Sequence, residues 1–244
     1  MSKRLLLLIA LLPLLALQVK AEESIPSVEV NAERDSEWAS YRHAYKTAAF
    51  FATFTRSRPL IQAQMQIRPL KPDASLEGLK LHLAGEKTSV DIAVDAIGRA
   101  DIPLSKQAYD EDAVLRLNRQ KGQYYFSGRY SIKQRSDGVY PLAELRAACE
   151  QLIDAQRASG YRLRLIGKHC AGVKFSYPAS AGDAPLEVRA EDGSLLPVTV
   201  SEGHPFEDNS MGMYKIALLR FTDLPQQGNV ITRSAPLAIG TAYE

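Results

Sequence analysis

One short segment of the sequence gathers side chains that could bind a metal ion. Three carboxylates and an imidazole occur there: Glu202, His204, Glu207 and Asp208. Oxygen ligands of this kind suit Ca²⁺, although the acidic positions lack the fixed spacing of a calcium-binding loop. A solvated loop between two strands is the alternative. We therefore expect no metal ion and no cofactor, and keep these four residues as the candidates should a metal bind.

A second candidate site lies on a stretch rich in aromatic residues. Alternation along residues 124–135 places Tyr125 and Arg129 on one face of a strand and most of the other aromatic side chains on the opposite face. Because one face must enter the core, Tyr125 and Arg129 are candidates for a surface that binds a sugar or a peptide. Ordinary strand composition is the alternative.

The motifs of the common hydrolases are absent from the sequence. There is no Gly-x-Ser-x-Gly, no His-Glu-x-x-His and no glycine-rich phosphate loop, and the four histidines are isolated from one another. A pair of catalytic carboxylates leaves no local motif, so a hydrolase whose catalytic residues are dispersed along the chain stays open. We predict no catalytic residue. The expected role is binding or cell-envelope assembly, with an envelope protein or a glycan as the partner.

The N-terminus has the pattern of a secretory signal peptide. Residues 1–4 carry two cations, the 13 residues from Leu5 to Leu17 are almost all apolar, and the chain becomes polar after Ala21. A membrane-spanning helix needs about 20 apolar residues, so cleavage after Ala21 is favoured over anchoring. We expect a signal peptide over residues 1–21 and a mature protein that is periplasmic or secreted, in a Gram-negative bacterium.

Charge and cysteine content narrow the range of partners. The chain has 30 basic and 28 acidic residues, and the expected leader carries three of the basic residues and no acidic one, which leaves 27 against 28. This balance argues against a nucleic-acid partner. No later apolar run is long enough for an integral membrane protein. Two cysteines in an exported chain predict one disulfide, between Cys149 and Cys170.

The periodicity of the apolar residues predicts a mainly β protein with two helices, near 36–53 and near 141–158. Ser36 is the expected cap of the first helix, and Pro141 is the expected first residue of the second. After the leader, the predicted segments are a lead-in with the first helix (22–57), a first antiparallel β-sandwich (58–135), a connector with the second helix and the disulfide (136–171), and a second β-sandwich (172–244).

Alternating apolar residues predict the strands of both sandwiches. The expected strands cover residues 61–67, 79–83, 90–94, 100–104, 114–118, 124–135, 161–165, 173–177, 186–190, 196–200, 213–221 and 229–239. Turns at Gly85-Glu86, Lys121-Gly122 and Asp192-Gly193 suggest hairpins. A further turn over Asp95–Gly98 is expected to bring residues 100–104 back as the return strand.

The stretch from Leu79 to Leu104, with its turn Asp95-x-x-Gly98-Arg99, resembles the transthyretin-like repeat of carboxypeptidase regulatory domains. Ala100 stands where that family usually has an aromatic residue. The resemblance implies a β-sandwich without catalytic residues of its own. As a whole, the chain resembles uncharacterised exported proteins of proteobacteria, which implies no activity.

Two tandem sandwiches of this length also suggest a pilus-type chaperone, although the two helices do not fit that class. An exposed edge strand beside a basic cleft would support such a function.

Overall fold

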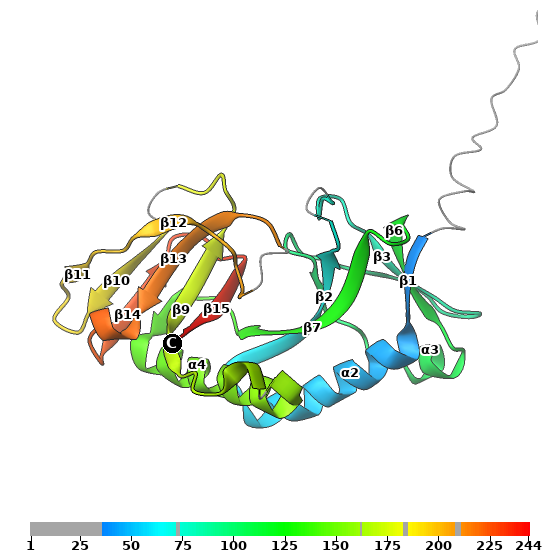
Figure 1. The fold of residues 1–244 in the computed structure, drawn as a ribbon, viewed down its shortest axis with the longest axis horizontal. Coiled ribbons are helices and arrows are strands. Elements are labelled where there is room, and N and C mark those ends of the chain that lie inside the picture. Colours follow the sequence, from blue (N-terminus) through cyan, green and yellow to red (C-terminus); the bar gives the residue numbers. More distant parts are fainter. Residues whose placement is uncertain (1–35, 72–73, 162, 183–184, 208–210) are drawn as a thin grey trace, which may run out of the picture.

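The computed structural model describes residues 36–71, 74–161, 163–182, 185–207 and 211–244 (Figure 1). It is mainly β, with 39% strand and 23% helix in four antiparallel sheets and three α-helices, which confirms the predicted fold class. The expected signal peptide and the rest of the segment up to residue 35 lie outside the described residues. Across the described ranges, no helix combines the length and apolar content needed to span a membrane.

The N-terminal half contains two sheets. Sheet A has the order β1 (Ser36–Ser40), β6 (Val114–Gln120), β3 (Leu81–Ala84) and β4 (Ser89–Ile92), and sheet B has the order β5 (Arg99–Ala100), β2 (Ile61–Pro69) and β7 (Tyr124–Ile132). Leucines of sheet A share a hydrophobic core with Met65, Ile67 and Tyr124 of sheet B. Helix α2 (Tyr41–Phe54) adds Tyr41 and Ala44 to this core, and the short α3 (Lys106–Asp110) adds Ala108.

The C-terminal half contains the other two sheets. Sheet C has the order β11 (Leu195–Leu196), β10 (Leu186–Ala190), β14 (Gly228–Thr232) and β8 (Val139–Pro141), and sheet D has the order β12 (Val200–Gly203), β13 (Tyr214–Arg220), β9 (Cys170–Tyr177) and β15 (Ala238–Tyr243). Both sheets and the buried face of α4 (Leu142–Gln156) contribute to one core. Ile61, Tyr130 and Ile132 of sheet B belong to the same core, so the two halves are packed together.

Sheet B is the part of the N-terminal half that packs against the C-terminal half (Figure 1). The odd-numbered residues of β2 enter the cores, as their alternation predicts. The even-numbered residues lie on the opposite, polar face, yet Gln66 is fully buried, together with Arg99 and Ser131. The reason is that Arg99 Nη2 donates to the carbonyl oxygen of Leu237, next to β15, at 2.6 Å, so the C-terminal half covers this polar face.

One of the two predicted helices is confirmed, and the other begins later than predicted. Helix α4 is confirmed over Leu142–Gln156, with Pro141 immediately before it rather than within it. Its predicted apolar face is buried: Leu142, Leu145, Ala148, Cys149, Leu152 and Ile153. The first helix was predicted five residues too early, because Ser36–Ser40 pairs with β6 as β1 and the helix begins only at Tyr41. Ser36 therefore does not cap it.

Several predicted strands also differ from the structure. Residues 163–165 form a 3₁₀ turn instead of a strand, after a helical turn in which Gly160 has a φ of 98°. The 196–200 strand is divided between sheets C and D, because Pro197 offers no N–H to a ladder. The 229–239 strand is two strands, β14 and β15. The Lys121-Gly122 turn joins β6 and β7, which lie in different sheets rather than in one hairpin.

Candidate functional site

The candidate site begins where the chain leaves sheet B. The predicted return strand over residues 100–104 is wrong: β5 ends at Ala100 and pairs with Met65 and Gln66 of β2, not with β4. The Tyr41 hydroxyl donates to the carbonyl oxygen of Pro103 at 2.5 Å and accepts the N–H of Ser105 at 2.8 Å. These two bonds hold the departing segment against the start of α2, away from β2.

Because the chain turns away after Ala100, no strand among the described residues pairs with this edge of β2 at Ile61–Gln64. Leu60 accepts the N–H of Lys133 on the β7 side, whereas Ile67 donates to Gly98 on the β5 side. Backbone groups point to alternate edges along a strand, so the N–H and C=O of Ala63 point away from β7. The C=O of Ile61 points the same way, while its N–H donates to Arg58 at 3.3 Å. We call this row the open edge.

A groove of about 500 Å³ lies along the open edge. Five consecutive β2 residues, from Ile61 to Met65, line it, as expected for a cavity at a strand edge. The opposite wall is α2, whose small side chains leave the space: Ala44, Ala48 and Ala52. Residues 101–104 contribute Asp101, Ile102 and Leu104. This α2–β2 groove is therefore mostly apolar, with backbone hydrogen-bonding groups along its floor.

The position of α2 depends on one glycine. The Phe51 ring lies directly over Gly128 of β7, where a Cβ atom would be 2.6 Å from the ring. Phe51 also packs edge-on against Tyr130, with ring centroids 5.1 Å apart. A side chain at position 128 would require the Phe51 ring to shift from its place between α2 and sheet B.

Charges of opposite sign mark the two ends of the groove. Arg56 and Lys133 line it near the N-terminal end of β2, and both residues are exposed. Within the described part of the chain, neither side chain forms an ion pair. Asp101 lies further along β2, where it accepts a hydrogen bond from the side-chain amide of Gln64 at 3.2 Å. The groove thus has a cationic end and an acidic end.

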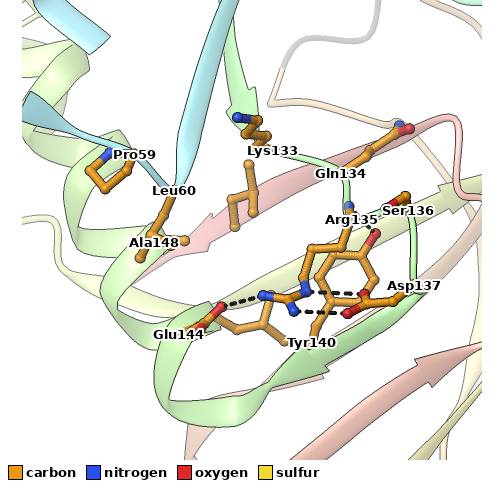
Figure 2. Close-up of a pocket in the computed structure, with 12 residues that line it drawn as sticks. Pro59, Leu60, Lys133, Gln134, Arg135, Ser136, Asp137, Tyr140, Glu144 and Ala148 are labelled. Atoms are coloured by element: carbon orange, nitrogen blue, oxygen red, sulfur yellow. Dashed lines mark hydrogen bonds and ion pairs between the residues drawn. The ribbon is translucent and has the colours of Figure 1, made fainter. Parts of the chain in front are cut away.

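A second pocket, of about 290 Å³, adjoins the groove at Pro59 and Lys133 (Figure 2). Arg135 lies in it between Asp137, at 2.8 Å, and Glu144, at 2.9 Å. The hydrogen bond from Arg135 lowers the pKa of Asp137 to about 2. A carboxylic acid that donates a proton in catalysis needs a raised pKa. These carboxylates are ion-pairing groups, and the pocket gives no support to a glycosidase mechanism.

A serine, a histidine and an aspartate meet on sheet A. His82 Nδ1 lies 2.7 Å from Asp91 Oδ1, and His82 Nε2 lies 3.3 Å from Ser89 Oγ, the connectivity of a hydrolase triad. The Asp91 side chain is 94% exposed and that of His82 39% exposed. Water screens such a pair strongly, so Asp91 orients the imidazole only weakly. Sequence reasoning missed this cluster because its members are close only through the β3–β4 pairing.

The structure describes three of the candidate metal ligands, Glu202, His204 and the exposed Glu207, and these three do not form a metal-binding group. Glu202 is exposed on β12, His204 Nδ1 lies 2.8 Å from the carbonyl oxygen of Gly212, and Asp208 lies outside the described residues. Among the residues that the structure describes, no three histidine, cysteine or acidic side chains are close enough to hold a metal ion.

The candidate binding residues of β7 are engaged within the protein. Arg129 Nε donates to Gln66 Oε1 at 2.6 Å, and the guanidinium lies 4.2 Å from the centre of the Phe206 ring. Arg129 therefore contacts both halves instead of facing solvent, because the C-terminal half covers its side of sheet B. Tyr125 is half-buried, with the Arg68 guanidinium 4.9 Å from its ring centre.

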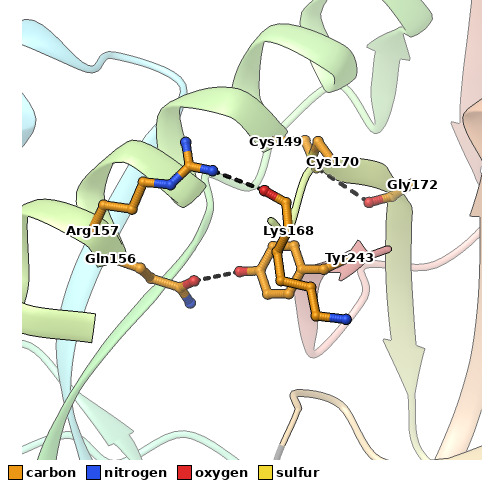
Figure 3. Close-up of a disulfide and its surroundings, with 7 residues drawn as sticks. All are labelled: Cys149, Gln156, Arg157, Lys168, Cys170, Gly172 and Tyr243. Atoms are coloured by element: carbon orange, nitrogen blue, oxygen red, sulfur yellow. Dashed lines mark hydrogen bonds between the residues drawn. A yellow bond between two sulfur atoms is a disulfide. The ribbon is translucent and has the colours of Figure 1, made fainter. Parts of the chain in front are cut away.

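The predicted disulfide is present and fixes the helix beside the second pocket (Figure 3). Cys149, on the buried face of α4, is joined to Cys170, the first residue of β9, with Cα atoms 6.1 Å apart. Two turns further along α4, the Tyr243 hydroxyl donates to Gln156 Oε1 at 2.5 Å. Because Leu145 and Ala148 of α4 line the pocket, the cross-link also fixes that wall.

No protein-family model, curated protein or solved structure matches the chain. The function is therefore inferred from the geometry of the site. One signal of the groove was present in the sequence: Pro103 lies inside the predicted return strand, where proline is unfavourable.

Proposed function

We propose that this is an exported, non-catalytic protein that binds an extended segment of another envelope protein by strand addition to the open edge of β2. The observation that carries the proposal is that the N–H and C=O of Ala63, on the floor of an open and mostly apolar groove, have no backbone partner among the described residues. An extended peptide satisfies such groups with its own backbone and uses the groove walls for its side chains.

The energetics favour a modest affinity that side chains can tune. A strand that follows the open edge gains about three backbone hydrogen bonds, each worth about 1 kcal/mol net. Apolar side chains that enter the groove add about 25 cal/mol per Å² buried. Ordering the peptide offsets part of this gain. Binding by backbone alone is therefore weak, and the fit of side chains against α2 decides which segments bind.

Export is supported by the leader pattern of residues 1–21 and by the disulfide, since disulfides persist in oxidising compartments such as the periplasm. The open edge also agrees with the condition that would support a chaperone-like role, because Arg56 and Lys133 place basic side chains beside it.

Replacing Ala63 with proline tests strand addition directly. Ala63→Pro removes an N–H that faces the groove and no ladder bond to β7, so the fold should tolerate it better than a proline at Gln62. The probe is a pool of hexapeptides with alternating random apolar residues and threonine, incubated with the full chain and identified by mass spectrometry. We expect the wild-type protein to retain a subset and Ala63→Pro to retain none.

Equal retention by both proteins, or no retention by the wild-type protein, would overturn the proposal. Circular dichroism of Ala63→Pro shows whether the variant is folded. Ala48→Leu provides a second blocked groove, since leucine favours a helix and fills the space above Ala63.

A further inference from the structure

We propose that the groove receives the free C-terminus of its peptide, which runs antiparallel to β2 with its terminal carboxylate against Lys133 and Arg56. This inference rests on the proposed function and adds to it a direction, a terminal group and a side-chain pattern.

The direction of the bound peptide follows from the direction of β5. This strand is antiparallel to β2, with Gln66 opposite Arg99 and Met65 opposite Ala100. A peptide that continues the line of β5 occupies the places that residues 102–104 leave empty. Asp101 already accepts a hydrogen bond from Gln64, so the last three residues of the peptide lie opposite Ala63, Gln62 and Ile61 in that order. Both existing neighbours of β2 are antiparallel, so the addition continues the same ladder pattern.

The charges select the same direction. A chain that ends opposite Ile61 brings its carboxylate to the end of the groove where Lys133 and Arg56 lie. Lys133 is adjacent to this end because its N–H donates to Leu60. A parallel peptide would place its carboxylate near Asp101, where two negative charges repel. In the antiparallel direction, Asp101 instead meets the N-terminal part of the segment.

The register also predicts the side chains. Residues opposite one another in an antiparallel pair point to the same face of the sheet. Ile61 and Ala63 share the face on which Phe51 of α2 packs, so the last residue and the third from the end face the apolar wall. The residue between them lies on the face of Gln62. The expected terminus is therefore apolar–polar–apolar, ending in a carboxylate.

The probe is an N-terminally fluorescein-labelled hexapeptide, Ser-Gly-Thr-Val-Thr-Val, with a free carboxylate. Fluorescence anisotropy with the full mature chain compares it with the same peptide ending in an amide. We expect amidation, Lys133→Glu or Arg56→Glu to weaken binding about fivefold, from the loss of exposed ion pairs. Lys121→Glu, in the exposed turn between β6 and β7, is the matched control and should leave binding unchanged.

N-methylation tests the register. Methylation of the valine third from the end removes an N–H that faces Ala63 and should weaken binding at least tenfold. Methylation of the threonine before the last residue leaves the edge contacts intact and should change binding less than twofold.

The outcomes separate this inference from the proposed function. Equal binding of acid and amide, with Ala63→Pro still blocking both, overturns the terminal carboxylate and leaves strand addition standing. If the acid binds better than the amide and neither N-methylation changes binding, the strand register is overturned. The peptide then binds as an anionic amphiphile that Lys133 alone holds. Binding that survives Ala63→Pro, or none of any peptide at millimolar concentration, overturns both.

Discussion

Replacing Arg99 should uncouple the two halves of the protein. The residue is 5% exposed and reaches both halves from the start of β5. Its Nε donates to Asp95 Oδ2 at 2.7 Å, Nη1 donates to Ser131 Oγ at 3.2 Å, and Nη2 donates to the Leu237 carbonyl oxygen at 2.6 Å. Arg99→Met keeps most of the volume and removes all three bonds, so it isolates their polar contribution.

The expected loss of stability is about 3 kcal/mol. Breaking a buried ion pair by removing one partner costs about 3 to 5 kcal/mol. The lower end applies because Asp95 is 37% exposed and keeps the backbone N–H groups of Ile97 and Arg99 as donors. Ser131 also keeps a hydrogen bond from the side-chain amide of Gln62. The carbonyl of Leu237 still accepts from Gln134, so no group is left entirely unpaired.

Urea unfolding followed by two signals measures this effect. Tryptophan fluorescence follows the segment around position 38 in the N-terminal half, because the sequence has one tryptophan, and far-ultraviolet circular dichroism reports on both halves. We expect coincident transitions in the wild-type protein and separate ones in Arg99→Met. Arg233→Met removes an exposed partner of Glu187 at 3.5 Å and should cost less than about 1 kcal/mol. A loss below 1 kcal/mol in Arg99→Met, with transitions that still coincide, would refute the reasoning.

Three further predictions concern other parts of the structure. Replacing Cys149 and Cys170 with alanine should lower the free energy of unfolding by about 3 kcal/mol, measured by urea titration; an unchanged midpoint in the wild-type protein after reduction would contradict this. Gly128→Ala should cost about 1 to 3 kcal/mol because its Cβ meets the Phe51 ring, and Phe51→Leu should restore part of the loss; equal melting temperatures of Gly128→Ala and the wild-type protein would count against the contact. Asp137 has a pKa lowered to about 2, so its contribution is present above its unfolded pKa of about 4 and is lost as the pH falls to 2. Asp137→Asn should make the melting temperature less dependent on pH between about pH 2 and pH 4. An unchanged pH dependence would exclude this role.

The local spacing of apolar residues predicted the elements that bury a single face. Helix α4 is the best example, since the residues at helical spacing are those that enter the C-terminal core. The turn at Asp95 was also predictable. Its carboxylate accepts the N–H groups of Ile97 and Arg99, and Gly98 has a φ of 79° that favours glycine. These features depend on residues within a few positions of one another.

The choice of neighbouring strand could not be predicted in the same way. The turn at Asp95 directs β5 to β2 instead of back to β4, and alternation is the same in either sheet. Ser36–Ser40 has helical spacing and is nevertheless a strand, because β6 offers an edge to pair with. Arg129 was expected on an exposed face, and only the packing of the C-terminal half places it between Gln66 and Phe206. The groove results from the absence of a neighbouring strand among the described residues, and Pro103 is the one local signal of it.

The polar layer around Arg99 explains how an incomplete sheet can present a rigid edge. Sheet A, α2 and α4 pack on the apolar face of sheet B, and Leu237 beside β15 accepts from Arg99 on its polar face, so β2 needs no further strand to stay in place. Exposed edges invite aggregation, and cations such as Lys133 beside a short edge oppose it. A preformed edge also lowers the ordering cost of binding. Because Arg99 begins β5, a peptide that extends β5 adds to the strand that joins the halves. Such a ligand should therefore raise the unfolding midpoints of both halves together.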